Sequence, residues 1–348
     1  MFLIIGLLFA CSVPAQDVQI GVFGLFHPQQ ITLRALRAPL IVHAGEQSFV
    51  LEPGGQLNEA KISASDGKLL LHVAGRIVQV PEITVAGRNA GRVDFTLSVP
   101  GKVSRSYFGV LMVKTENGEV VPVVGMELET AVGSVVQAET APGTPLEALK
   151  AQAIVTRSYF VGGKGRHHNF DFCDLTHCQV LREPPHADSP VAKAVHATQG
   201  LVITYEGKPV ATMFTRSCGG HTRTPAELGI RVNGYLYFAV VCDYCYKNPP
   251  RWTRRISSED AELLSSKSEA GRLAIDRRLG WNAVPGNTYT MQTVNGEVVL
   301  EGAGQGHGIG LCQRGAKAMA EDGADYREIL AHYFPNTLLE NINKSLGH

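Results

Sequence analysis

Residues 128–139 read LETAVGSVVQAE, and residues 145–153 read PLEALKAQA. In the first stretch the apolar residues recur at i, i+4, i+7 and i+8, at Leu128, Val132, Val135 and Val136. This spacing predicts an amphipathic helix whose apolar face packs against a core. Glu139 follows at the end of that helix.

The second stretch predicts another helix. Thr144 has the residue type of an N-cap, Pro145 fits the first turn, and Glu147 completes a capping box. We expect this helix to end near Phe160. Further helices are predicted at residues 189–200, 313–322 and 326–334, each bounded by a Gly or Pro at its end.

The preceding part of the chain, residues 18–124, has the pattern of β-structure. Apolar and polar residues alternate over residues 93–99, the period of a half-buried strand. Three hairpins are predicted at the turns 117–118, 206–207 and 295–296. Since strands and helices mix without a repeating βα unit, we predict an α+β fold of hairpins and short helices around a substrate groove, with a β-rich N-terminal part.

Composition excludes several classes of protein. The 348 residues contain 32 Lys and Arg against 32 Asp and Glu, with 44% hydrophobic and 18% charged residues. This is an ordinary globular composition, and its charge balance argues against nucleic acid as a partner. No later segment reaches the about 18 apolar residues of a membrane span, so we expect none in the mature protein.

The first fifteen residues resemble an export signal. Residues 2–10 form an apolar run too short for a membrane span, and a small-residue cleavage site follows at residues 12–15. Alternatively, residues 8–11 resemble a lipobox with Cys11 as the lipidated residue. We therefore expect an exported protein of the cell envelope or periplasm, either soluble or lipid-anchored.

Six cysteines remain when Cys11 is set aside. Cys173 and Cys178 form a close pair beside histidines, and the other four are scattered: Cys218, Cys242, Cys245 and Cys312. These four allow three disulfide pairings, among which the sequence does not choose. The Cys242-x-x-Cys245 pair fits a disulfide or a metal site better than a redox pair, since nothing around it resembles a thioredoxin unit.

Four segments together resemble the stage II sporulation protein D/LytB (amidase enhancer) family. They are residues 128–159, with PLEALKAQA and Thr-Arg-Ser-Tyr, then residues 171–179, 217–222 and 306–316, the last reading GHGIGLCQRGA. Their order over residues 107–340 implies a SpoIID/LytB-like catalytic domain there, after a β-rich accessory part at 16–106. Cys312 stands where the family commonly has Ser, and Arg314 where it commonly has an aromatic residue.

The resemblance implies a peptidoglycan lytic transglycosylase that cleaves glycan strands lacking stem peptides, with Glu139 catalytic. One carboxyl group suffices for this reaction because the C6 hydroxyl of the sugar attacks C1 and forms a 1,6-anhydro ring. Glu139 would protonate the glycosidic oxygen and then accept the proton of the C6 hydroxyl. The alternative is a non-catalytic wall-binding protein that enhances a partner amidase. From its spacing alone, Glu139 fits a solvated residue at a helix end better than a catalytic one.

The substrate-binding candidates come from the same segments: Gln152, Arg157, Gly219, Gly220, Thr222, Tyr235, His307 and Gln313. Three of them have structural alternatives. Arg157 fits either a donor to sugar or an ion pair, and Tyr235 either a stacking ring or a core residue. His307 lies among glycines that let the backbone approach a ligand, or it belongs to a plain glycine-rich turn.

A zinc site is predicted at His167, Cys173, His177 and Cys178, with His168 able to replace His167. Two thiolates and two imidazoles suit tetrahedral zinc, and the segment resembles the family's, with which zinc is associated. Four protein ligands leave no open position, so the metal would be structural. The rival is a Cys173–Cys178 disulfide.

Overall fold

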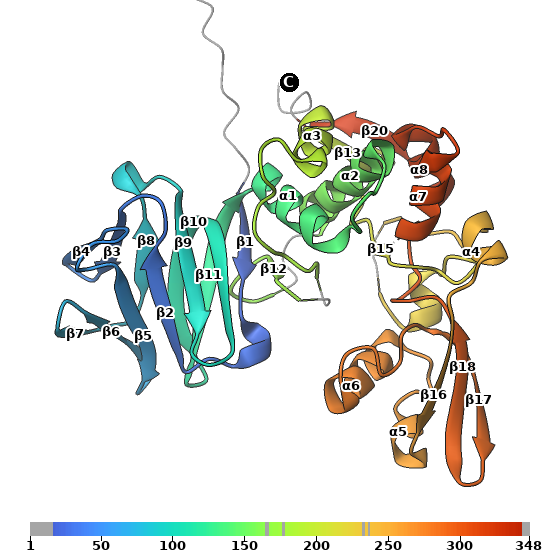
Figure 1. The fold of residues 1–348 in the computed structure, drawn as a ribbon, viewed down its shortest axis with the longest axis horizontal. Helices are drawn as coiled ribbons and strands as arrows, with labels where there is room; N and C mark the ends of the chain where they lie inside the picture. The colour runs from blue at the N-terminus through green and yellow to red at the C-terminus, as the bar shows by residue number, and fades with distance from the viewer. Residues whose placement is uncertain (1–16, 164–166, 176–177, 232–233, 236, 343–348) are drawn as a thin grey trace, which may run out of the picture.

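The computed structural model describes residues 17–342, except 164–166, 176–177, 232–233 and 236. The predicted export signal at residues 1–15, with Cys11, and the predicted ligand His177 lie outside the described residues. Figure 1 shows a β-rich N-terminal half beside a group of helices, with a separate hairpin region at the C-terminal side. The α+β prediction is confirmed.

The N-terminal half is one large sheet. Its main path runs β12-β1-β11-β10-β9-β2-β5-β6-β7, and β3, β4 and β8 branch from it. The strands are β1 (Asp17–Gly21), β2 (Gln30–Ala35), β3 (Leu40–Ala44), β4 (Gln47–Leu51), β5 (Glu59–Ser65), β6 (Lys68–Val73), β7 (Arg76–Val80), β8 (Ile83–Ala86), β9 (Val93–Val99), β10 (Val103–Glu116), β11 (Glu119–Glu127) and β12 (Phe172–Cys173). The alternation predicted for residues 93–99 is confirmed in β9, where every second residue is buried.

The sheet does not end where the accessory part was predicted to end. The predicted division between residues 106 and 107 falls inside β10, which pairs with β9 on one side and β11 on the other. Parallel to β1 lies β12, which comes from the later part of the chain. Arg105 of β10 also donates to the buried carboxylate of Asp174 at 2.6 Å, which fastens the segment after β12 to the sheet.

The helix predicted before Glu139 is α1 (Leu128–Glu139), and its buried residues include all four of the predicted apolar positions. The second predicted helix is α2 (Leu146–Gly162). Its capping was predicted wrongly: Pro145 is the N-cap, because the Thr144 hydroxyl donates back to the Ala141 carbonyl at 2.6 Å. Glu147 instead pairs with Lys150.

The rest of the chain surrounds α2. Helices α3 (Pro190–Ala197), α7 (Gln313–Glu321) and α8 (Tyr326–Tyr333) match the three further predictions. The other elements are α4 (Asp243–Lys247), α5 (Ser258–Glu262), α6 (Glu269–Leu279), β13 (Leu201–Tyr205), β14 (Lys208–Pro209), β15 (Phe214–Thr215), β16 (Arg251–Ile256), β17 (Thr288–Val294), β18 (Glu297–Ala303), β19 (Leu311–Cys312), β20 (Leu338–Asn341) and three short 3-10 helices (Gly24–Phe26, Arg88–Ala90 and Pro225–Leu228). The predicted hairpins are β10–β11, β13–β14 and β17–β18.

Helix α2 joins two of the three hydrophobic cores. Leu149, Ala153 and Phe160 pack with the sheet, whereas Ala151 and Val155 pack in the core of α7 and α8. Residues 151–160 of α2 are all buried, so the middle of this helix is covered on every side although it includes polar residues such as Gln152 and Arg157. The third core lies under β16, β17, β18, α5 and α6.

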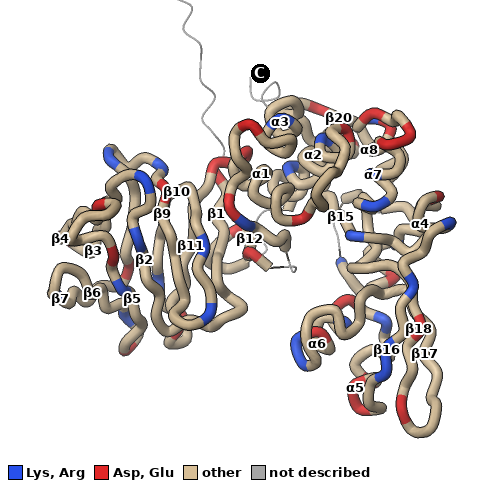
Figure 2. Tube along the Cα trace, in the orientation of Figure 1, with Lys and Arg blue, Asp and Glu red and all other residues tan. Residues whose placement is uncertain are grey.

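Charged residues of both signs are interspersed along the chain (Figure 2). Within the described residues, no helix combines the length and the apolar character needed to cross a bilayer.

Candidate functional site

Glu139, the last residue of α1, borders two cavities. The first cavity, of about 380 Å³, reaches toward α7 and is lined mainly by Gln152, Arg216, Tyr244, Gln305, Gln313 and Glu321. The second, of about 510 Å³, reaches toward α6 and is lined among others by Val180, Arg216, Glu269, Arg272, Asp276 and His307. Glu139 is half-buried and lines both of these partly open cavities.

The surroundings of Glu139 favour the protonated carboxyl group. Burial raises its pKa above the usual range. A hydrogen bond from the Val180 backbone and the positive charges of Arg216 and Arg182 oppose this rise only in part. A carboxyl group with a raised pKa can hold a proton nearer to neutral pH and give it up on demand, as a general acid must.

Two of the predicted substrate-binding residues, Gln152 and Gln313, line the first cavity beside Glu139. The Gln313 side-chain amide donates to the Glu139 backbone carbonyl at 3.2 Å, so the first residue of α7 touches the last residue of α1. Gln152 is buried on α2, and its Oε1 has no hydrogen-bond partner among the described residues.

His307 lines the second cavity, where its Nδ1 accepts the Ile309 backbone N–H at 3.0 Å. Burial lowers the pKa of His307, and the negative charge of Glu269 opposes that shift. The ring is therefore neutral at pH 7, with Nδ1 already used as an acceptor.

The glycines around His307 allow another segment of the backbone to pack closely against this loop. Gly306 and Gly310 have φ of +90° and +72°. A Cβ on Gly306 would lie 2.7 Å from Thr215 Oγ1, and one on Gly310 would overlap the Met213 carbonyl. The close approach that these glycines allow is thus made by residues 213–215 of the neighbouring segment, in place of the expected ligand.

Arg157 is a structural residue. Its side chain is fully buried and forms a bidentate ion pair with Glu129 of α1, at 2.8 Å and 2.7 Å. It also donates to the carbonyls of Leu201 and Val195. Of the two alternatives, the ion pair is what the structure contains, and Arg157 lines neither cavity.

Four more candidates line neither cavity. Tyr235 is a core residue that donates its hydroxyl to the Pro335 carbonyl at 3.0 Å. The Thr222 hydroxyl is buried and bonded to the backbone of Val240. Gly219 and Gly220, both with positive φ, form the turn before it. The side chains of Tyr235 and Thr222 bond to the protein's own backbone, and the two glycines allow the turn. All four residues therefore have a structural role in the segment behind the cavities.

Two residues that sequence reasoning missed, Arg216 and Gln305, line both cavities. Both lie next to quoted motifs, Arg216 just before Ser217-Cys218 and Gln305 just before Gly306. Their position next to these motifs is the signal by which Arg216 and Gln305 could have been predicted from the sequence. The residues of α6, by contrast, had none, because Glu269, Arg272 and Asp276 belong to a polar stretch without any recognised pattern.

Three of the four predicted zinc ligands come together. One ligand atom each of His167, Cys173 and Cys178 lie within 4.8 Å of one another, and His167 Nε2 is 3.3 Å from Cys178 Sγ. Cys173 and Cys178 are thiols and do not form the rival disulfide. Cys178 also lines the second cavity, two residues before the Val180 backbone that faces Glu139. The donor set of one imidazole and two sulfurs fits zinc.

The four remaining cysteines also converge, in a second group behind the first cavity. None of them is in a disulfide, so none of the three pairings is present.

The sequence is similar to a family of sporulation proteins and to several individual proteins. A family model described as "SpoIID: Stage II sporulation protein" matches residues 116–205, which include Glu139 and the His167–Cys178 cluster. An uncharacterized protein of Brachyspira hyodysenteriae is 30% identical over 271 residues, covering 68% of this chain and 73% of the relative. Stage II sporulation protein D of Bacillus amyloliquefaciens is 25% identical, covering 61% and 74%. The amidase enhancer of Bacillus subtilis is 22% identical, covering 56% of this chain and 38% of the relative.

Proposed function

This chain belongs to the stage II sporulation protein D/LytB family, and on that premise we propose that it is a peptidoglycan lytic transglycosylase with Glu139 as its acid and base. A cell-wall-related role in the cell envelope follows from the family. The bond cleaved and the residue that cleaves it are the proposal.

The observation that carries the proposal is the contrast between Glu139 and the other carboxylates of the two cavities. Glu269 and Asp276 are both bound to Arg272, at 2.5 Å and 2.8 Å, and Glu321 lies 3.7 Å from Lys317. Within the described residues Glu139 has no such ion pair. Burial acts to raise the pKa of Glu269 too, but its pairing with Arg272 outweighs burial and leaves the pKa below its usual range. Burial also raises the pKa of Asp276, but its carboxylate is held in the ion pair with Arg272. Glu139 is thus the carboxyl group of these cavities that combines a raised pKa with the absence of an ion pair among the described residues.

A single such group suits intramolecular cleavage. Glu139 donates its proton to the glycosidic oxygen as the bond to C1 breaks, and the C6 hydroxyl of the same sugar adds to C1. The carboxylate then accepts the hydroxyl proton, so Glu139 ends in its starting state. No second carboxylate is needed to activate water, unlike in ordinary glycoside hydrolysis. The amides of Gln152, Gln305 and Gln313 offer neutral donors and acceptors for sugar hydroxyls.

Zinc held by His167, Cys173 and Cys178 would be structural in this proposal. It would fix the segment of Gln179 and Val180, which lines the second cavity and places a backbone hydrogen bond on Glu139. His177 stays a predicted fourth ligand.

The test is digestion of purified, peptide-stripped glycan strands, with 1,6-anhydromuramic ends measured by mass spectrometry. We expect the parent protein to form them and Glu139→Gln to be slower by about 100- to 10,000-fold, the usual contribution of a general acid. Glu321→Gln is the matched control, since it makes the same change in the first cavity, and it should keep near-parent activity. Equal activity of Glu139→Gln and the parent would refute the assignment.

The second candidate function is a non-catalytic protein that enhances a cell-wall amidase, favoured by the similarity to the amidase enhancer. It predicts strand binding without anhydro ends, and stimulation of an added amidase by parent and Glu139→Gln alike. The same set of proteins therefore separates the two functions.

A further inference from the structure

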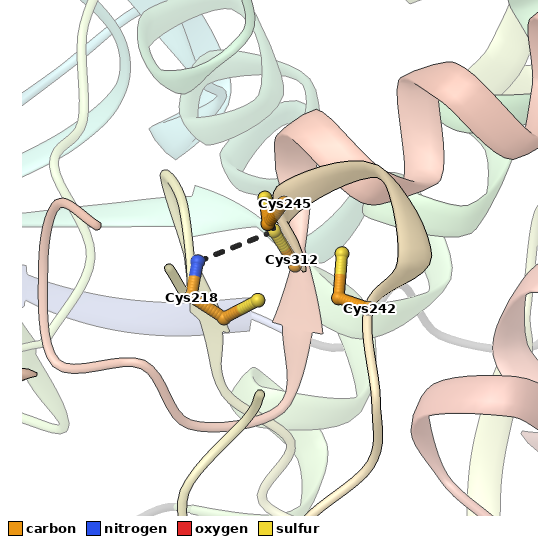
Figure 3. A group of neighbouring side chains, drawn as sticks. All are labelled: Cys218, Cys242, Cys245 and Cys312. Atoms are coloured by element: carbon orange, nitrogen blue, oxygen red, sulfur yellow. Dashed lines mark hydrogen bonds between the residues drawn. The ribbon is translucent and has the colours of Figure 1, made fainter. Parts of the chain in front are cut away.

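Four cysteines from distant parts of the sequence meet in the core behind the first cavity. Cys218 follows β15, Cys242 and Cys245 flank the start of α4, and Cys312 ends β19. Each is at most 2% exposed. Figure 3 shows their sulfurs turned toward a common centre.

The distances among the sulfurs fit one bound metal ion. All four lie within 4.8 Å of one another, and Cys245 Sγ is 3.6 Å from Cys312 Sγ. Zinc–thiolate bonds of about 2.3 Å at tetrahedral angles put sulfurs about 3.8 Å apart. A disulfide needs about 2.05 Å. Cys218 is within hydrogen-bond range of all three other thiols, so proximity selects no pair.

Hydrogen-bond donors surround the sulfurs from outside the group. The Cys218 N–H donates to Cys312 Sγ at 3.4 Å, as Figure 3 shows. The Ser217 hydroxyl lies 3.3 Å from Cys245 Sγ, and the Tyr333 hydroxyl donates to Cys242 Sγ at 3.4 Å. Such donors stabilise the negative charge of metal-bound thiolates and orient them.

We propose that Cys218, Cys242, Cys245 and Cys312 form a tetrathiolate zinc site. Four protein ligands in tetrahedral arrangement leave no open position, so the ion is structural. The soft, all-sulfur donor set excludes calcium and magnesium and selects zinc among redox-inert ions. This site is separate from the His167–Cys178 cluster and does not depend on the proposed activity.

The zinc ion joins three segments that each contribute to the first cavity. Arg216 lies two residues before Cys218, Tyr244 lies beside Cys245, and Gln313 follows Cys312. Arg314 adds a contact within this wall, with its guanidinium 5.6 Å from the centre of the Tyr244 ring. Short segments with little regular structure thereby acquire a fixed position opposite Glu139.

The experiment uses the full chain carrying Cys173→Ser, which removes a sulfur of the other cluster. We expect about one zinc per chain by elemental analysis, and X-ray absorption showing sulfur neighbours at about 2.3 Å and no nitrogen or oxygen. Adding Cys312→Ser should lower both the zinc content and the number of sulfur neighbours. Ser217→Ala, which removes only a donor to sulfur, should keep zinc but weaken its binding by about 10- to 100-fold.

Three results would overturn the site. One is zinc-free Cys173→Ser protein whose non-reduced mass shows two disulfides. The second is bound iron in place of zinc. The third is a metal shell containing nitrogen or oxygen before Cys312 is changed. If the Cys312→Ser chain does not fold, the absorption spectrum of the Cys173→Ser protein decides alone.

Discussion

The helical side of the Glu139 cavities packs through apolar faces and a buried ion pair, whereas the opposite side consists of short segments that meet at four cysteines. On the helical side, α1 and α2 are joined by the ion pair between the fully buried Arg157 and the partly buried Glu129. On the other side, β15, β19 and α4 are two to five residues long. Elements that short gain little stability from regular hydrogen bonding. Their positions therefore depend on the contacts among the four cysteines at which they meet.

This difference indicates that a helix positions the Glu139 carboxyl group, whereas short segments joined at the cysteines position the wall that faces it. Perturbing the helical side should affect global stability, and perturbing the cysteine side should affect local order. Gln313 connects the two through its bond to the Glu139 carbonyl.

Breaking the ion pair on the helical side should destabilise the protein most. Arg157→Ala leaves the Glu129 carboxylate without its partner, so we expect a loss of about 3–5 kcal/mol in the free energy of unfolding, measured with urea. Arg34→Ala is the matched control, because Arg34 donates two hydrogen bonds to Glu59 Oε2 in an ion pair at the surface. Its loss should be below about 1 kcal/mol. Equal losses of unfolding free energy in the two variants would show that the Arg157–Glu129 pair stabilises the protein no more than a surface ion pair does.

The next effect concerns the junction between α7 and the cysteines. A Cβ on Gly315 would collide with the Tyr333 hydroxyl and Cys242 Sγ. Although Ala usually favours a helix, Gly315→Ala should cost about 1–3 kcal/mol through overpacking. Tyr333→Phe in the same chain should recover part of that loss in urea denaturation. A neutral control is Gly24→Ala, since open space surrounds Gly24.

Removal of zinc from the Cys173→Ser protein should loosen only the side that carries Cys218, Cys242, Cys245 and Cys312. After chelation, we expect trypsin to cleave after Lys247 of α4 about tenfold faster, equivalent to about 1.4 kcal/mol of local stability. Cleavage after Lys150 of α2, followed in the same digest by mass spectrometry, should not change. Acceleration at both sites would mean that the two sides are not independent.

The smallest expected effect is a pH dependence. Burial raises the pKa of Glu139 above its ordinary value of 4.5, so the folded chain binds this proton more tightly than the unfolded chain. Stability from this group is therefore present below pH 4.5 and is lost as pH rises through the folded pKa. Glu139→Gln has no proton to lose, and its thermal stability relative to the parent should increase with pH above 4.5.

Much of the fold could be predicted from local patterns. The period of residues 128–136 gave α1, and the Asn117-Gly118 turn gave the β10–β11 hairpin, because both signals act between near neighbours in sequence. The capping of α2 was missed for a local reason as well, since Thr144 uses its hydroxyl in the preceding turn.

The site was predictable only in part. The His167–Cys178 cluster lies within one short segment, and its residues could be proposed together from their spacing. Cys218 and Cys312 are 94 residues apart, and only the tertiary fold brings them together. The same limit applies to Arg157, whose partner Glu129 sits on another helix, and to the α6 residues around the second cavity.

The pairing of β12 with β1, together with the Arg105–Asp174 bond, bears on how this molecule could diverge. A replacement for the N-terminal sheet would have to supply both an edge that receives residues 172–173 and a cation at the position of Arg105. Recombination that exchanges this half for an unrelated module would therefore disturb the segment leading to Val180 and Glu139. We therefore expect the two halves to occur together in related proteins and not to be exchanged as separate domains.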